Sequence, residues 1–117
     1  MNKHEEKHWE RVARLGCIAC LLDGEENSYV SLHHVHGRTK KDAHLNILPL
    51  CAGHHQNGTG QDKYTVAVHP YKARFEALYG PQEDLLWLVA ELLNKECAFT
   101  QSELLDAYKK KDGGTTW

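Results

Sequence analysis

The sequence lacks a strong excess of charge of either sign. It carries 14 Lys and Arg residues against 16 Asp and Glu residues, which gives a formal net charge of −2. This balance excludes the strongly basic chains that bind nucleic acid by bulk electrostatics, and it also excludes acidic disordered tails. Charge alone therefore identifies no partner.

Long apolar segments are also absent. No stretch approaches the roughly 18 consecutive apolar residues of a membrane span. The charged N-terminus MNKHEEK is not followed by the apolar core of a signal peptide. We therefore expect no membrane partner and a location in the cytoplasm. In that compartment the four cysteines are expected to be metal ligands or buried thiols rather than disulfides.

Internal repeats and low-complexity linkers are missing as well, and 117 residues leave room for one compact domain. Residues 21–29 are rich in turn formers. Apolar alternation predicts a strand over 29–35, a short return at 47–48 that Pro49 ends, and a second strand-like run over 64–69. Helical periodicity and caps predict helices over 3–15, over 71–79, from Pro81 onward, and over about 101–111 behind a capping box at Thr100, with a frayed tail after it.

Histidine is the residue that the chain has in excess. Six of its nine histidines fall within positions 33–55, together with Cys51. Imidazole is both a metal ligand and a proton acceptor near neutral pH, so this clustering points to chemistry rather than to packing.

The strongest motif pairs Cys17-x2-Cys20 with Cys51-x2-His54. Each half aims two soft donors at one point, and together they form the Cys3His set of structural Zn²⁺. A closed site with four ligands leaves no position for substrate, so we expect it to tie the end of the first helix to the middle of the chain. The alternative is that the cysteines are small buried hydrophobic residues and His54 is a turn residue.

A second set of histidines remains outside this motif: His33, His34, His36, His44, His55 and His69. His55 directly follows a zinc ligand, so the metal would fix the backbone that presents it. His33 and His34 point to opposite faces of a strand, unless a bulge or bend lets both reach one cavity. Beside a divalent metal, a histidine stays neutral near pH 7 and can accept a proton from water.

In their order along the chain, these motifs resemble the HNH (ββα-metal) nucleases: Cys-x2-Cys, then LHHV at 32–35, then NILPLC-x2-HH at 46–55. More narrowly, HH-x2-GR at 33–38, His44, LPLC-x2-HH at 48–55 and VAVHP-x-K-x2-FE-x2-YG at 66–80 resemble the phage recombination-enhancement (Ref) family of RecA-dependent nucleases. The resemblance implies an α+β fold with a small zinc-stabilised HNH core over about 9–93. Helices at both ends would flank this core within a single domain of residues 1–117.

The resemblance also implies roles for individual residues. His34 would be the general base, His33 and His55 would bind the catalytic metal, and Asn46 would orient the base, with His44 as the alternative for that last role. The usual position of a third ligand, one turn beyond His55, holds the poor ligand Thr59. His69 is then the natural substitute, as a ligand or a phosphate contact; alternatively it caps the next helix.

The implied activity is metal-dependent hydrolysis of DNA phosphodiester bonds by a phage-encoded endonuclease of the bacterial host cytoplasm. A RecA filament would direct the nuclease during DNA recombination. The filament would hold the DNA and so compensate for the low DNA affinity expected of a near-neutral chain. The catalytic ion would be Mg²⁺, although an imidazole-rich site also suits Mn²⁺, Ni²⁺ or Zn²⁺. Cationic side chains that could contact flanking phosphates, or could simply be solvated, are Arg38, Lys40, Lys41, Lys72 and Arg74.

A second hypothesis is a non-catalytic zinc module that binds nucleic acid or a recombination protein. The sequence counts against it, because a base candidate, two ligand candidates and an orienting residue occur together. A hydrolase of some other substrate is disfavoured, since no apolar substrate pocket is evident in the sequence.

Overall fold

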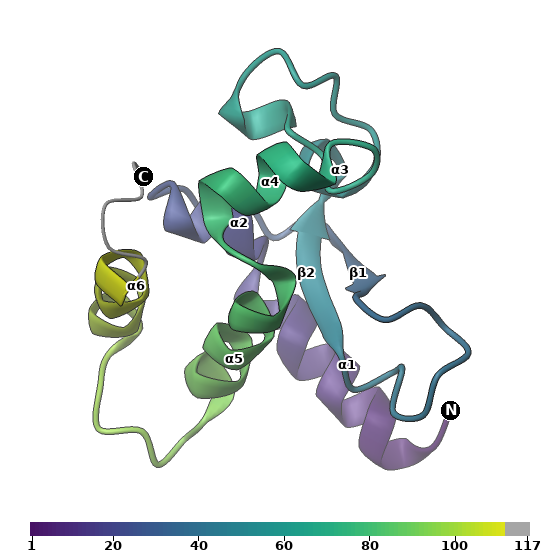
Figure 1. Cartoon of the computed structure of the whole chain (residues 1–117). Coiled ribbons are helices and arrows are strands. Elements are labelled where there is room, and N and C mark those ends of the chain that lie inside the picture. Colours follow the sequence, from purple (N-terminus) through teal and green to yellow (C-terminus); the bar gives the residue numbers. More distant parts are fainter. Residues whose placement is uncertain (112–117) are drawn as a thin grey trace.

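The structure, a computed structural model, describes residues 1–111 (Figure 1). These residues form a small α+β fold in which helices accompany a two-stranded antiparallel sheet, as expected. The elements in chain order are α1 (Lys3–Leu15), α2 (Ile18–Leu22), β1 (Val30–His34), β2 (Ile47–Cys51), α3 (Ala52–His55), the 3₁₀ turn η1 (Lys63–Thr65), α4 (Lys72–Tyr79), α5 (Gln82–Leu93) and α6 (Gln101–Lys111). The frayed tail expected after α6 lies outside the described residues.

The first helix has the predicted bounds, with a signal at each end. Asn2 and Glu5 form a capping box, in which each side chain accepts from the other residue's backbone N–H at 2.8 and 3.0 Å. Gly16 ends the helix at φ 79°, where an added Cβ would lie 2.8 Å from the Asn27 carbonyl oxygen. The chain then turns at once into α2, which was not expected, because five consecutive apolar residues show no helical period.

The two strands pair in one antiparallel register, with His33 opposite Leu48 and Leu32 opposite Pro49. Pro49 therefore lies inside β2, and the prediction that it ends the strand is wrong. Each strand of a two-stranded sheet has one edge without a strand partner. A proline is tolerated there, because the N–H group that it lacks would have had no partner in the sheet. All five residues of β2 are buried, so this strand runs through the core.

The prediction of a second strand-like run over 64–69 is also wrong. Its residues form the end of η1 and then a buried segment, Val66–Val68, that is neither helix nor strand and enters a turn at Val68. The backbone N–H groups of Val68 and His69 donate to the carbonyl oxygens of His54 and His55 at 2.8 and 3.0 Å. The segment therefore satisfies the free carbonyls at the end of α3 instead of joining the sheet.

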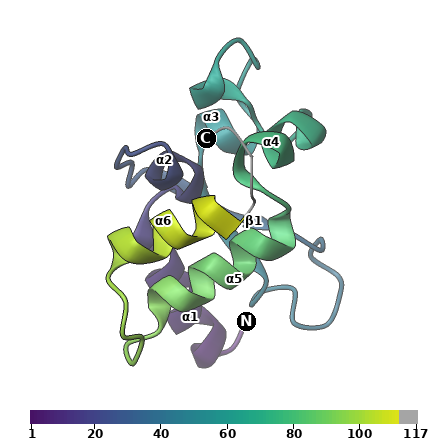
Figure 2. The ribbon, with the colours of Figure 1, turned by 60° about the vertical axis from the view of Figure 1, so that its left-hand side comes forward.

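Helices α4 and α5 meet at a sharp corner formed by Gly80 and Pro81. The capping box expected at Thr100 is confirmed, since Glu103 N–H donates to Thr100 Oγ1 at 3.1 Å. Helix α6 packs against both α5 and α2 (Figure 2). Within residues 1–111, no helix combines the length and the apolar character that crossing a membrane requires.

Substitution Leu88→Ala should test the core around α5. Leu88 is fully buried, so the change is expected to lower the free energy of unfolding by about 2–5 kcal/mol. Urea unfolding of the metal-loaded protein measures it. The control Ala90→Ser, at an exposed position of the same helix, should stay within about 0.5 kcal/mol of the wild type. Equal effects of the two substitutions would contradict the placement of α5 in the core.

Candidate functional site

The side chains of Cys17, Cys20, Cys51 and His54 converge in the interior as a buried cysteine–histidine cluster. Cys17 precedes α2 and Cys20 lies within it, so the short helix brings both sulfurs to one side. Cys51 ends β2 and His54 follows in α3. The donor atoms all lie within 4.8 Å of one another, although the two pairs come from distant segments of the chain.

The spacing of these donor atoms matches tetrahedral zinc. With Zn–S bonds of about 2.3 Å and a Zn–N bond of about 2.0 Å, a tetrahedron separates two sulfurs by about 3.8 Å and a sulfur from a nitrogen by about 3.5 Å. The Sγ atoms of Cys20 and Cys51 are 3.8 Å apart. His54 Nδ1 lies 3.5, 3.6 and 3.2 Å from the sulfurs of Cys17, Cys20 and Cys51. The cluster can therefore hold a metal such as zinc.

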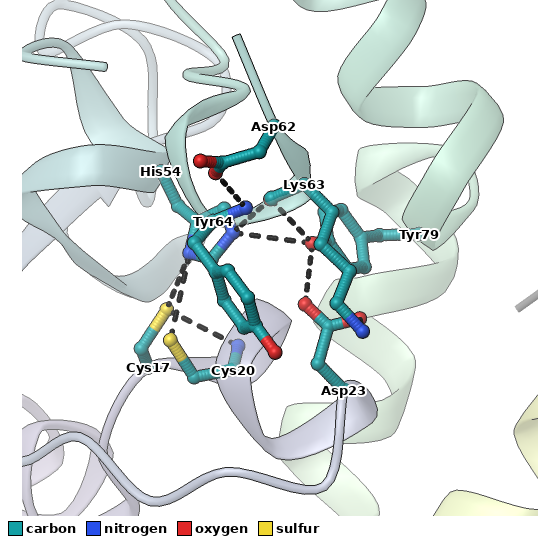
Figure 3. Close-up of polar contacts among 8 residues, drawn as sticks. All are labelled: Cys17, Cys20, Asp23, His54, Asp62, Lys63, Tyr64 and Tyr79. Atoms are coloured by element: carbon teal, nitrogen blue, oxygen red, sulfur yellow. Dashed lines mark hydrogen bonds and ion pairs between the residues drawn. The ribbon is translucent and has the colours of Figure 1, made fainter. Parts of the chain in front are cut away.

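The far side of the His54 ring is fixed by hydrogen bonds (Figure 3). Its Nε2 lies 2.8 Å from the Lys63 carbonyl oxygen and 3.1 Å from the Tyr79 hydroxyl. That hydroxyl donates to Asp23 Oδ2 at 2.7 Å. Because a carbonyl oxygen only accepts, the Nε2 atom carries a proton, and Nδ1 is the atom aimed at the sulfurs.

Electrostatics inside the cluster also favour a cation. Burial alone opposes charge on His54, but hydrogen bonds to the sulfurs of Cys17 and Cys51 raise its pKa to about 10. Hydrogen bonds from the Cys17 and Cys20 thiols, and then from His54, lower the pKa of Cys51. A lowered pKa at Cys51 favours the thiolate that binds a metal, and metal binding to His54 Nδ1 would displace any proton held there.

A second group, the imidazole triad, consists of His33, His55 and His69, whose ligand atoms also lie within 4.8 Å of one another. His33 comes from β1 and His55 from the last position of α3. His69 is brought in by its backbone bond to the His55 carbonyl oxygen. The centroid of the His33 ring lies 5.3 Å from that of His55 and 4.9 Å from that of His69.

Two rings of the triad, those of His33 and His55, have pKa values below the ordinary value of histidine. Burial lowers the pKa of His33 to about 4, with His69 and His55 adding to the effect. Burial and then the neighbouring His69 lower the pKa of His55 as well. Lone pairs on these rings are therefore available to a divalent cation at neutral pH.

Two polar side chains hold the triad from behind. The Gln82 Oε1 atom lies 2.7 Å from His33 Nε2, and the Ser31 Oγ atom lies 2.7 Å from His55 Nδ1. No local signal marks Gln82, which is 49 residues from His33 along the chain. Ser31 was missed as well, although it precedes His33 by two residues on the same face of the strand, where alternation could have indicated it.

His34 and His44 form a separate pair. His34 Nε2 lies 3.2 Å from His44 Nδ1, and the edge of Trp9 contacts both rings. Trp9 also donates to the His44 carbonyl oxygen at 2.8 Å. The Asn46 amide instead donates to the Asp42 carbonyl oxygen at 3.1 Å. Of the two candidates for orienting His34, His44 is the one that touches it.

A pocket of about 270 Å³ joins His34 to the triad. It is lined by His33, His34, Gly37, Arg38, His55, Gln56 and His69. The two adjacent histidines of β1 therefore reach one cavity, although they pack against different neighbours. Burial, followed by the Arg38 charge and His44, lowers the pKa of His34. His34 is consequently a neutral proton acceptor at pH 7.

The basic residues named from the sequence lie in different places. Arg38 lines the pocket, and Lys40 and Lys41 are exposed on the loop that follows it. Lys72 and Arg74 are exposed on α4, where the Arg74 guanidinium stacks over the Tyr71 ring at 5.7 Å. Of these cations, Arg38 is the one that lines the pocket.

One comparison with known protein families found a match. A family model described as recombination enhancement, RecA-dependent nuclease matches residues 2–94. The match covers both the cysteine–histidine cluster and the imidazole triad, together with β1, β2 and α3. It ends just after α5, so α6 lies beyond it.

Substitution Cys17→Ser should remove the metal of the cysteine–histidine cluster. Serine offers zinc no thiolate, so the zinc content of the purified chain, measured by plasma emission spectroscopy, is expected to fall by about one atom per chain. The matched control is Cys97→Ser, because Cys97 is a free cysteine outside the cluster. Loss of zinc from both variants, or from neither, would contradict the assignment.

Proposed function

Because this chain belongs to the family of recombination enhancement, RecA-dependent nucleases, we propose that it is a metal-dependent DNA endonuclease whose catalytic ion is held by the imidazole triad. We further propose that it forms a single HNH-type nuclease domain of residues 1–117, of phage or prophage origin, and that a RecA filament directs it. The observation that carries the proposal is the pocket in which three convergent imidazoles lie beside a further, neutral histidine.

The order of the elements around the pocket supports an HNH core. Two antiparallel strands lead directly into a short helix, and His33 lies on the first strand while His55 lies on the helix. The cysteine–histidine cluster sits on the same helix through His54. In this proposal the cluster is scaffolding, and the triad is the site of chemistry.

The chemistry divides between the ion and the histidine pair. When bound to the triad, a divalent ion would neutralise charge on a phosphate oxygen and on the leaving 3′-oxygen. His34 accepts a proton from the attacking water, and His44 holds the His34 ring in place. Arg38 contacts a phosphate at the pocket rim. The products would carry a 5′-phosphate and a 3′-hydroxyl.

The donor set of the triad bears on the identity of the ion. Three imidazole nitrogens suit Mn²⁺, Ni²⁺ or Zn²⁺, whereas Mg²⁺ prefers carboxylate and water oxygens. We therefore propose that a transition-metal ion binds this site with higher affinity than Mg²⁺, which would be a weaker substitute.

The proposed dependence on RecA agrees with the charge of the chain. Phosphate contacts supply most non-specific affinity for DNA, and a protein with a net charge of −2 and one cation in its pocket can make few of them. A filament that already holds the DNA would present the substrate to the pocket. The chain then needs catalytic groups in its pocket more than it needs a high affinity of its own for DNA.

A cleavage assay tests the proposed function. Purified protein is incubated with Mn²⁺ and duplex DNA, with and without a RecA filament paired to the duplex. We expect cleavage that needs the ion and increases strongly with the filament. Substitution His34→Ala should lower the rate at least about 100-fold, because it removes the general base. Zinc content should not change.

The matched control is His4→Ala, which removes an exposed histidine from α1 and should leave the rate unchanged. Equal cleavage with and without the filament would contradict the RecA dependence. No cleavage under any condition, with zinc retained, would overturn the nuclease proposal and favour a zinc module that only binds nucleic acid or a recombination protein.

The cleavage rate should also depend on pH in a defined direction. His34 must be neutral to accept a proton, and its pKa is lowered from 6.5 by burial and by Arg38. The rate at saturating Mn²⁺ should therefore be flat near pH 7 and should fall only below pH 6.5. A profile of single-turnover rates between pH 5 and 8 measures this, and a midpoint above 6.5 would contradict His34 as the base.

A further inference from the structure

A series of hydrogen bonds, buried at His33 and Gln82 and partly buried at Glu76, runs from the imidazole triad to the corner between α4 and α5. His33 Nε2 lies 2.7 Å from Gln82 Oε1, and Gln82 Nε2 donates to Glu76 Oε2 at 3.2 Å. Among the described residues, the buried polar side chains are three histidines and Gln82, which is 8% exposed. A buried amide needs partners for both of its ends, and here both have one.

The donor and acceptor roles in this series of hydrogen bonds follow from its last member, Glu76. A carboxylate only accepts hydrogen bonds, so Glu76 must face the NH₂ group of Gln82. The amide oxygen then faces His33, and an oxygen can only accept from a ring nitrogen. The proton of neutral His33 is therefore held on Nε2, and its lone pair is left on Nδ1.

The bond behind His55 is oriented less strongly. Ser31 Oγ lies 2.7 Å from His55 Nδ1, and its hydroxyl also makes a long bond of 3.5 Å to the Leu50 carbonyl oxygen. Because a hydroxyl can donate or accept, only this long bond favours acceptance from Nδ1. Of the two residues that hold the triad from behind, Gln82 is the one that a carboxylate orients.

We propose that Gln82, oriented by Glu76, is a positioning residue that fixes the His33 proton on Nε2 and presents Nδ1 to the divalent ion. This inference rests on the proposed role of the triad as a metal site. It makes the corner between α4 and α5 a part of the metal centre, since Glu76 lies in α4 and Gln82 is the first residue of α5. The neighbouring Glu83 joins the start of α5 to the connection after β1 through its 3.0 Å contact with His36.

Loss of such a partner costs metal affinity. Residues that fix the ring of a metal-binding histidine typically change affinity by about 10- to 100-fold when they are replaced. Gln82→Leu keeps the size of the side chain but removes the acceptor for Nε2–H. The proton of His33 is then free to move to Nδ1, where it competes with the ion.

The first measurement is the tautomer of His33, read from ¹⁵N shifts of the ring in zinc-loaded protein without a second ion. We expect the wild type to carry the proton on Nε2 and Gln82→Leu to show a mixture of both tautomers. A wild-type proton on Nδ1 would overturn the inference, whatever the variant does. So would a tautomer that is unchanged in Gln82→Leu.

The second measurement is Mn²⁺ affinity, from calorimetric titration of the same zinc-loaded protein. Gln82→Leu should weaken Mn²⁺ binding by about 10- to 100-fold, whereas the control Gln61→Leu, at an exposed loop position, should not. The exchanged pair Glu76→Gln with Gln82→Glu should recover most of the affinity. In that pair residue 82 still accepts from His33, and residue 76 now donates to it. A purely structural role would not be rescued in this way.

The two proposals can fail separately. If wild-type protein binds no Mn²⁺ that depends on His33, tested with His33→Ala, the proposed metal site is overturned, while the tautomer measurement still decides the role of Gln82. If Mn²⁺ binds through His33 and Gln82→Leu binds it equally well, the inference fails and the metal site stands.

Discussion

The convergence of Cys17 and Cys20 with Cys51 and His54 is the interaction on which the rest of the molecule depends. The sheet has only two strands, and such a pair is marginally stable in water without further support. The four donors join the α1–α2 region to the end of β2 and to α3, which is only four residues long and could not persist alone. The free energy of metal binding is thereby available to the fold.

The same short helix links the two metal-binding groups. His54 points into the cysteine–histidine cluster and the adjacent His55 into the imidazole triad. The carbonyl oxygens of both residues accept from the segment that delivers His69. The backbone of α3 is thus constrained on both sides. The geometry of the imidazole triad therefore depends on that of the cysteine–histidine cluster.

Much of this arrangement could be predicted from local sequence, because its determinants are local. The helix caps at Asn2 and Thr100 use residues three positions apart, and the spacing of Cys17 and Cys20 needs only one turn of chain. Partners set by tertiary packing could not be predicted in this way. Gln82 contacts His33 although the two are 49 residues apart in the sequence. The apolar alternation over 64–69 likewise did not indicate that the N–H groups of Val68 and His69 would donate to the carbonyl oxygens of α3 rather than to a neighbouring strand.

Helix α1 reaches into the pocket region through Trp9, which donates to the His44 carbonyl oxygen and packs against the His34 ring. His8 adds a 3.2 Å hydrogen bond to the Leu45 carbonyl oxygen. These contacts anchor the connection 35–46 between the strands, which would otherwise sample many conformations at a cost of about 1–2 kcal/mol for each residue that must be ordered. The smallest portable unit is therefore larger than the strands and α3. A graft of those elements onto another scaffold would carry the triad but would leave the histidine pair without its support.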